Sequence, residues 1–274
     1  MKSCPKVAFL GSSGSYSEEA SYKFFNGKLI PVNFKTINLI FQQFSENNFD
    51  YAVVPIENSI EGSVNQTYDL LYTSKAKICG EVFLKIDHHL LANKGTKITQ
   101  IKRVFSHQQA ISQCLPFIEK NGFEPIPHYD TASSAKLIAS EKLMDSAAIS
   151  SSRSAGIYDL QILKKDISIN QSNYTRFIIL SKNDCEPSGN DKTSIIINLK
   201  HVHSSLYHAL GEFASRKINL TKIESRPIKG NSWEYLFYID FEGNKKETLC
   251  RSTLQNLKKH CNSIKILGSY KQAL

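Results

Sequence analysis

The chain has 274 residues, enough for two domains, and its hydrophobic fraction of 41% and charged fraction of 22% are those of a globular protein without a membrane span. The net charge of +9 would attract nucleic acid, but the lysine pairs are scattered and no arginine-rich tract or RNA-binding signature accompanies them, so we expect a solvated basic surface and no nucleic-acid partner. Six widely spaced cysteines without a Cys-x-x-Cys pair indicate neither a zinc site nor a disulfide framework, and we expect no metal and reduced thiols.

The N-terminus passes directly from Met-Lys-Ser-Cys-Pro-Lys into a short apolar run, too short for a signal-peptide core and without a small-residue cleavage site. We therefore expect a cytoplasmic protein with no membrane partner. Up to residue 180, apolar runs alternate with segments of helical period, which predicts an α/β domain with mainly parallel strands. The runs that predict strands are 7–10, 51–56, 82–91, 104–105, 147–149 and 177–180.

The first predicted strand is followed by the loop Gly-Ser-Ser-Gly-Ser-Tyr-Ser-Glu-Glu-Ala at 11–20. The helix that begins near Ser17 has free backbone N–H groups at its start, and anions bind at such places through the unpaired donors and the helix dipole. A glycine turn with a serine cap explains the same residues. This loop alone therefore fits both a binding site and a plain turn.

The second polar segment is Val-Val-Pro-Ile-Glu-Asn-Ser-Ile-Glu-Gly-Ser-Val at 53–64. A predicted buried strand ends within it and is followed closely by Asn58, Ser59 and Gly62. Open α/β sheets bind ligands at the carboxyl ends of their strands. Loops that only close a turn seldom need amide, hydroxyl and carboxylate groups together, so the segment predicts a ligand site, with a simple turn as the alternative.

The third segment, 169–180, is mostly polar until it turns apolar at Phe177. Arg176 has the geometry to hold a carboxylate through two hydrogen bonds, and Thr175 offers a hydroxyl donor beside it. Arg176 equally fits a surface position on a strand, and Thr175 a β-branched strand former. The segment alone leaves both possibilities open.

Histidines and serines elsewhere give weaker predictions. His88 and His89 would point to opposite faces of a strand, so they are not expected to share a metal. His201 and His203 would share one strand face, but a zinc site would need further ligands that the sequence does not supply. The candidate serines lack a Gly-x-Ser-x-Gly elbow, which argues against a serine hydrolase.

A composition break at 181–192, where turn formers and charged residues lie between two apolar strands, predicts a domain boundary. Downstream the predicted order is strand, helix, strand, strand, helix, strand, a βαββαβ unit that is ferredoxin-like in outline. These elements are expected at 194–199, 204–216, 219–224, 234–241, 247–261 and 263–267.

Taken together, these segments resemble the prephenate dehydratase family over nearly the whole chain. Residues 54–63 match the family's signature without a break, and Asn-Tyr-Thr-Arg-Phe at 173–177 carries its Thr-Arg-Phe motif. Ser-His-Gln-Gln-Ala at 106–110 is similar to a third motif, with Gln108 in place of the usual proline. Glu-Ser-Arg-Pro at 224–227 resembles the motif that marks the ACT regulatory domain of this family.

The resemblance implies that residues 1–183 form a catalytic domain of two α/β lobes, in the manner of type II periplasmic binding proteins, with the substrate in the cleft between them. Residues 192–274 would form a ferredoxin-like ACT domain. The family converts prephenate to phenylpyruvate on the route to L-phenylalanine, and the resemblance implies neither a cofactor nor a metal.

The resemblance assigns the catalytic role to Thr175, which would help hydroxide leave. A threonine hydroxyl is too weak an acid to give up its proton near neutral pH, so we expect it to donate a strengthening hydrogen bond to the departing oxygen. Asp130 replaces a serine of the family, and we expect its carboxylate to point away from a dianionic substrate. The expected substrate-binding residues are Asn58, Ser59, Gly62, Ser106, Thr131, Arg176 and Phe177.

In the ACT domain, Ser204 replaces a family glycine, and its Cβ would obstruct a close approach or a positive φ. We still expect an amino-acid effector, with L-phenylalanine first, and a homodimer or homotetramer, because ACT domains commonly pair through their sheets. The expected effector-binding residues are Ser204, Leu206, Glu224, Ser225, Arg226 and Pro227. Arogenate dehydratase and a non-catalytic amino-acid sensor remain the alternatives.

Overall fold

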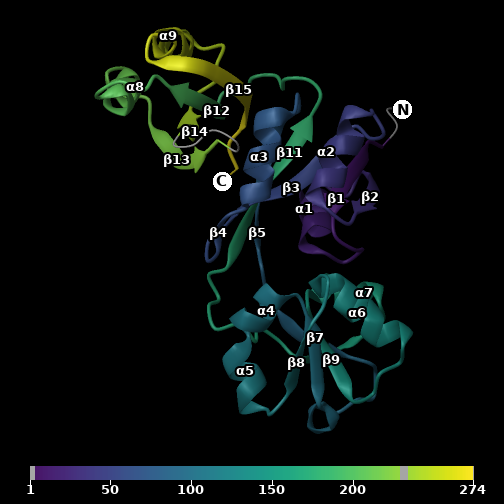
Figure 1. Ribbon diagram of the computed structural model, residues 1–274. Coiled ribbons are helices and arrows are strands. Elements are labelled where there is room, and N and C mark those ends of the chain that lie inside the picture. Colours follow the sequence, from purple (N-terminus) through teal and green to yellow (C-terminus); the bar gives the residue numbers. More distant parts are fainter. Residues whose placement is uncertain (1–3, 229–233, 274) are drawn as a thin grey trace. The chain divides into compact units, whose positions relative to one another are not determined.

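The computed structural model describes residues 4–228 and 234–273, which fold into two compact units (Figure 1). The first unit comprises the residues up to 67 together with 82–177, and the second comprises 68–81 and the residues from 178 onward. The predicted domains, 1–183 and 192–274, are each continuous in sequence, whereas the compact units are not. The difference arises because the segment 68–81 packs with the C-terminal sheet.

The first sheet along the chain has the strand order β2-β1-β3-β11-β5, with the short β4 paired to β3. Its strand β1 pairs in parallel with both β2 and β3, and residues 7–9 within it are buried. The side chains of Ser15 and Thr36 accept hydrogen bonds from backbone N–H groups at the starts of α1 and α2, which fixes where these helices begin. The elements are β1 (Lys6–Leu10), α1 (Tyr16–Phe24), β2 (Ile30–Phe34), α2 (Ile37–Ser45), β3 (Tyr51–Asn58), β4 (Gly62–Ser63), α3 (Asn65–Thr73), β5 (Lys77–Lys85) and β11 (Tyr174–Ser181).

The second sheet, which lies wholly in the first unit, has the order β10-β6-β9-β7-β8. Strand β7 pairs in parallel with β8 and β9, while β6 pairs antiparallel with β9 and β10. Helices α4 and α5 contribute to a core on one face, and α6 and α7 to a core on the other. The elements are β6 (His89–Ala92), η1 (Ile98–Gln100), β7 (Arg103–Ser106), α4 (Gln108–Gln113), α5 (Leu115–Lys120), β8 (Glu124–Pro127), α6 (Thr131–Ser140), β9 (Ser146–Ser150), α7 (Ser152–Ile157) and β10 (Gln161–Lys164).

The apolar run 82–91 is not the single strand that we predicted. Strand β5 ends at Lys85 and β6 begins at His89, and the two strands belong to different sheets. The residues between them, Ile-Asp-His at 86–88, therefore form a connection, in which Ile86 is buried. His88 consequently lies outside a strand, and the expectation that its ring and that of His89 alternate across a strand is wrong.

The C-terminal sheet has the order β13-β14-β12-β15, with antiparallel pairing throughout, and α8 and α9 lie on one of its faces (Figure 1). The βαββαβ order of elements is as predicted, but the second helix ends at Leu257, four residues before the predicted end at Cys261. The elements are β12 (Asp191–Leu199), α8 (Ser205–Ala214), β13 (Leu220–Pro227), β14 (Tyr235–Glu242), α9 (Thr248–Leu257) and β15 (Cys261–Lys271).

Other side chains of this sheet contact the segment 68–81. The rings of Tyr68 and Tyr238 meet edge to face with centroids 4.8 Å apart. The buried amine of Lys192 lies 2.9 Å from a carboxylate oxygen of Glu81. Strand β15 comes so close to β5 that a Cβ at Gly268 would lie 2.0 Å from a backbone oxygen, so this position requires glycine.

Of the helices described, none is long and apolar enough to cross a membrane.

Candidate active site

The first unit contains a cavity of about 860 Å³ lined by residues from both of its sheets and their loops. Helices α1 and α6 begin at this cavity, after the caps Ser15 and Asp130. Backbone N–H groups in the first turn of a helix have no intrahelical acceptor and carry partial positive charge. The loop 11–20 thus contributes Gly11 and the start of α1 to the cavity wall. Its sequence alone fitted either an anion site or a plain turn.

Five of the residues predicted to act on the substrate line this cavity together: Asn58, Gly62, Thr131, Thr175 and Phe177. They come from the end of β3, from β4, from the first turn of α6 and from β11. Three segments that are distant in sequence, around residues 58–62, 131 and 175–177, therefore meet at one site. Gly62 has a φ of +79°, a conformation that favours glycine.

Thr175 is held by an amide whose orientation is fixed. Asn58 Oδ1 accepts hydrogen bonds from the backbone N–H groups of Ile60 and Glu61, both at 3.0 Å, so the other end of the amide must be its NH₂ group. This Nδ2 donates to Thr175 Oγ1 at 3.0 Å and to Asn173 Oδ1 at 2.7 Å. Because Thr175 Oγ1 accepts here, its own proton remains available to an acceptor in the cavity.

Three other predicted substrate-binding residues do not line the cavity. Ser59 is exposed, and its hydroxyl bridges the loop to the start of β11 by donating to Ser172 O at 3.0 Å. Ser106 is fully buried and donates to Ile149 O at 2.7 Å, so its hydroxyl supports the second sheet. Arg176 is also buried, and since neighbouring strand residues point to opposite faces, it lies on the other face of β11 from Thr175.

The expectation that Asp130 points away from the cavity is wrong, because this residue lines it. Its carboxylate is nevertheless occupied. One oxygen accepts from the backbone N–H of Ser133 at 2.5 Å, which caps α6, and the other accepts from the backbone N–H and hydroxyl of Ser12 at 3.3 and 3.2 Å. The carboxylate therefore joins the first loop to the second sheet's helix.

A chain of hydrogen bonds behind Thr175 includes residues that the sequence did not single out. Asn173 Nδ2 donates to Gln113 Oε1 at 2.9 Å, and His88 Nε2 lies 3.2 Å from the same oxygen. The other ring nitrogen of His88, Nδ1, lies 3.0 Å from the hydroxyl of Tyr16. Burial raises the pKa of Tyr16 well above its usual value and lowers the pKa of His88 to about 4.

Some of these residues carried a signal in the sequence. Asn173 and Gln113 lie in or beside motifs that matched the family, so their proximity to Thr175 was a reasonable expectation. His88 carried no such signal, because it lies within the segment 82–91 that was predicted to be a single strand. Within the described residues, no group of three or more His, Cys, Asp or Glu side chains is arranged to hold a metal ion.

Comparison with known proteins decides the family. The model of the prephenate dehydratase family matches residues 7–185. The chain belongs to the prephenate dehydratase family. It is 43% identical to the prephenate dehydratase of Methanocaldococcus jannaschii over 96% of this chain and 97% of that protein, and 40% identical to arogenate dehydratase/prephenate dehydratase 2 of Arabidopsis thaliana over 97% and 72%. The crystal structure of the Arthrobacter aurescens prephenate dehydratase in complex with L-Phe superposes with a TM-score of 0.88 at 30% identity, covering 98% and 90% of the two chains.

The matched region of the prephenate dehydratase family ends at residue 185, so the predicted effector site lies beyond it. A groove of about 680 Å³ on the C-terminal unit is lined by residues that include Ser204 and Leu206. Ser204 has a φ of +61° and precedes α8. The expectation that the Cβ of Ser204 obstructs a positive φ is therefore wrong, because the serine adopts the left-handed conformation that the family's glycine would take more easily.

The remaining predicted effector residues, Glu224, Ser225, Arg226 and Pro227, lie on the edge strand β13 and do not line this groove. Arg226 forms an ion pair with Asp69 at 3.1 Å, on the segment 68–81. Within one chain, therefore, the two groups of predicted effector residues lie at different places on the C-terminal unit.

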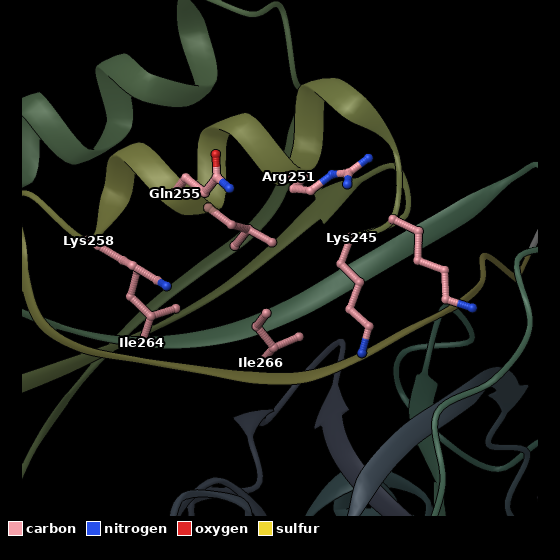
Figure 2. Close-up of a pocket in the computed structure, with 8 residues that line it drawn as sticks. Lys245, Arg251, Gln255, Lys258, Ile264 and Ile266 are labelled. Carbon is pink, nitrogen blue, oxygen red and sulfur yellow. The ribbon is translucent and has the colours of Figure 1, made fainter.

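A second groove, of about 530 Å³, lies between α9 and β15 in the prephenate dehydratase's C-terminal unit (Figure 2). Lys258 and Lys245 lie at opposite ends of it, with Ile264 and Ile266 between them. The amine of Lys245 is 2.6 Å from a carboxylate oxygen of Asp184. The amine of Lys246, also in the lining, is 3.5 Å from a carboxylate oxygen of Glu186, so acids of the chain itself pair with both of these lysines.

Proposed function

We propose that the chain catalyses the decarboxylating dehydration of prephenate to phenylpyruvate, the step that leads to L-phenylalanine, and that Thr175 assists the departure of hydroxide. The observation that carries the proposal is the hydrogen bond from Asn58 Nδ2 to Thr175 Oγ1 at the cavity wall. It leaves the threonine as a donor toward the substrate. We also propose a cytoplasmic enzyme that needs no cofactor.

The reaction asks little of the protein beyond positioning and stabilisation of charge. The ring carboxylate leaves as CO₂, its bonding electrons move into the ring, and the bond to the ring hydroxyl breaks, so that an aromatic ring and hydroxide form. Aromatisation drives the step, and the protein has to orient the substrate and stabilise the leaving oxygen. A donor that itself accepts a hydrogen bond is polarised and donates more strongly. Asn58 places Thr175 in that state.

Arogenate, in which an amino group replaces the keto oxygen of prephenate, is the second candidate substrate. Glu61 supports it, because this carboxylate lies at the cavity and would attract an ammonium group. The Arabidopsis relative carries both substrate names. The two candidates are separated by comparing kcat/KM for prephenate and arogenate on the same protein preparation.

The test of Thr175 uses two replacements of different chemistry. Thr175→Val keeps the shape of the side chain and removes the donor, and we expect it to lower kcat about 10²-fold to 10³-fold, as loss of a donor to a developing oxyanion does. Thr175→Ser keeps the hydroxyl and should stay within about tenfold of the wild type. Phenylpyruvate is measured by its absorbance in alkali. Equal activity of the two variants would remove Thr175 from the mechanism, and a wild type inactive on both substrates would leave the amino-acid sensor as the better explanation.

We further propose that the C-terminal sheet is an ACT domain and that L-phenylalanine binds where two chains meet, in a homodimer or homotetramer. Two observations support this: Ser204 and Leu206 share a groove, and the effector motif at 224–227 lies on an edge strand where a second chain has access. The Arthrobacter aurescens relative was solved in complex with L-Phe. Isothermal titration with L-phenylalanine and light scattering with and without it test the proposal; no heat and a monomer in both conditions would contradict it.

A further inference from the structure

The cavity lacks an evident counter-charge for its substrate. The described residues that line it include no lysine or arginine, although they include the carboxylates of Glu61 and Asp130. Helix starts supply partial positive charge, but the start of α6 already faces Asp130. Prephenate carries two carboxylates, and two negative charges at a partly desolvated site need compensation. The helix starts give only partial charges, so a histidine that becomes protonated is the remaining source of a full positive charge among the described lining residues.

We propose that His88, neutral in the empty cavity, takes up a proton as the dianionic substrate binds and supplies the positive charge that the cavity wall lacks. The inference rests on the proposed function, because it requires a dianionic substrate. It makes His88 a charge-compensating residue at the site of Thr175, which retains the role of donor to the leaving oxygen.

Hydrogen-bond directions around His88 are decided by its neighbours. Glu61 Oε1 is an acceptor only and lies 3.3 Å from Gln113 Nε2, so Gln113 turns its NH₂ group to Glu61 and its Oε1 to Asn173 and His88. His88 Nε2 therefore carries a proton. In the neutral ring, Nδ1 is then an acceptor.

The surroundings of Nδ1 have room for a second proton without any movement. The hydroxyl of Tyr16 lies 3.0 Å from Nδ1 and 2.7 Å from the backbone oxygen of Asp87. With neutral His88, the single proton of Tyr16 serves only one of these two acceptors. With protonated His88, Nδ1–H donates to the tyrosine oxygen and the tyrosine donates to Asp87 O, so both contacts are satisfied. The site is thus already arranged for an imidazolium.

Burial explains why His88 is neutral before the substrate enters, and the charged groups around it act in both directions. Burial is the main reason that its pKa falls to about 4, and nearby His89 lowers it further, while the carboxylate of Asp87 raises it. Across Tyr16 lies Glu19, and across Gln113 lies Glu61. The substrate's two carboxylates would act in the same direction as these acids and raise the pKa of His88 toward neutrality.

The second histidine of the lining provides a matched control. His107 is exposed, and its Nδ1 accepts a hydrogen bond from the backbone N–H of Gln109 at 3.3 Å at the start of α4. Protonation of this nitrogen would break that cap. His107→Gln therefore removes a histidine from the cavity without removing the proposed site of proton uptake.

The experiment is the pH dependence of kcat/KM for prephenate between about pH 6.5 and 8.5, with blanks for spontaneous breakdown of the substrate. If binding requires uptake of a proton by a group that is neutral in the free enzyme, kcat/KM, which reports the free enzyme, falls about tenfold for each pH unit over this range. We expect this slope in the wild type and in His107→Gln. His88→Gln and His88→Asn should show lower kcat/KM at pH 6.5 and a flat profile.

The outcomes distinguish a failure of the role proposed for His88 from a failure of the proposed reaction. A flat profile in an active wild type, or an unchanged slope in a folded His88→Gln variant, overturns the role of His88. Absence of prephenate turnover by the wild type would contradict the proposed reaction and not the role assigned to His88. Thermal melting checks that the variants are folded. The glutamine and asparagine replacements of His88 differ in size, so a packing defect would give them different activities, whereas loss of the proton site would affect both equally.

Discussion

The loop after β1 is fastened to the second sheet's helix α7 at Gly14, and replacing this residue by alanine tests how much that contact stabilises the first unit. Gly14 has a φ of +89°, and an added Cβ would lie 2.6 Å from Ser154 Oγ and 3.1 Å from Ser154 Cα. Ser154 Oγ also donates to Gly14 O at 3.0 Å, while the backbone N–H of Gly14 donates to Glu18 at 2.7 Å. Ser154 Oγ also accepts hydrogen bonds from the hydroxyls of Ser150 and Ser151 at 2.9 and 3.2 Å, so its displacement would disturb these bonds.

Two terms determine the expected size of the effect. A side chain in the left-handed region costs about 1–2 kcal/mol relative to glycine. The forced displacement of Ser154 adds the overpacking penalty of about 1–3 kcal/mol. Gly14→Ala should therefore lower the free energy of unfolding by about 2–5 kcal/mol, and KM should rise because neighbouring residues of this loop line the cavity.

Urea unfolding followed by circular dichroism measures the change. Gly27→Ala is the matched control, because Gly27 has a φ of +75° but nothing within 4 Å of an added Cβ, so it shows only the first term. Ser154→Ala in the Gly14→Ala background removes the nearest clashing atom and should recover part of the loss. If Gly14→Ala is no worse than Gly27→Ala, the close packing between loop and helix does not contribute as argued.

Three further predictions concern buried groups. Glu81→Gln leaves the buried amine of Lys192 without its carboxylate, so it should lower the free energy of unfolding in urea by about 3–5 kcal/mol. Replacing both residues by apolar ones should lower the free energy of unfolding much less. Gly268→Ala should destabilise the protein by about 3 kcal/mol or prevent folding, because the added Cβ would lie 2.0 Å from a backbone oxygen. Gly211→Ala is the control: this glycine lies in open space on α8, and the replacement should stabilise the protein by about 0.5–1 kcal/mol. The lowered pKa of His88, about 4, means that the unfolded chain binds the extra proton first, so stability should fall as pH drops from about 6.5 to 4, by up to about 3 kcal/mol. A His88→Gln variant with the same acid sensitivity as the wild type would contradict this last prediction.

The sequence predicted most of the buried strands, because a strand covered on both faces is apolar throughout and its run of residues is easily read. The prediction of a single strand at 82–91 was wrong for a related reason. Ile86 is buried in a connection between two sheets, and its apolar side chain does not distinguish such a connection from a strand. The predicted domain boundary did not anticipate that 68–81 packs with the C-terminal sheet. That contact depends on tertiary pairing, which no local pattern expresses.

At the candidate site, a motif match named the segments correctly but did not give the direction of each side chain. Thr175 and Phe177 line the cavity while Arg176 between them does not, which the alternation of a strand would have predicted once the strand was known. Ser106 illustrates the harder case, because its hydroxyl supports the neighbouring strand through Ile149 O. Membership of a motif therefore does not separate residues that touch the substrate from residues that hold the scaffold.

The polar network shows why the chemistry of this site is a property of the whole first unit. The direction of the Thr175 hydroxyl follows from the orientation of Asn58, which two backbone N–H groups fix at the end of β3. The orientation of Gln113 follows from Glu61, and it decides in turn which nitrogen of His88 carries the proton. Residues 58–61 of one loop thereby orient both amides, Asn58 through backbone N–H groups and Gln113 through the Glu61 carboxylate, and with them the proposed leaving-group donor and the proposed site of proton uptake. The hydrogen-bonding roles proposed for Thr175 and His88 therefore depend on this loop as well as on the segments that carry the two residues.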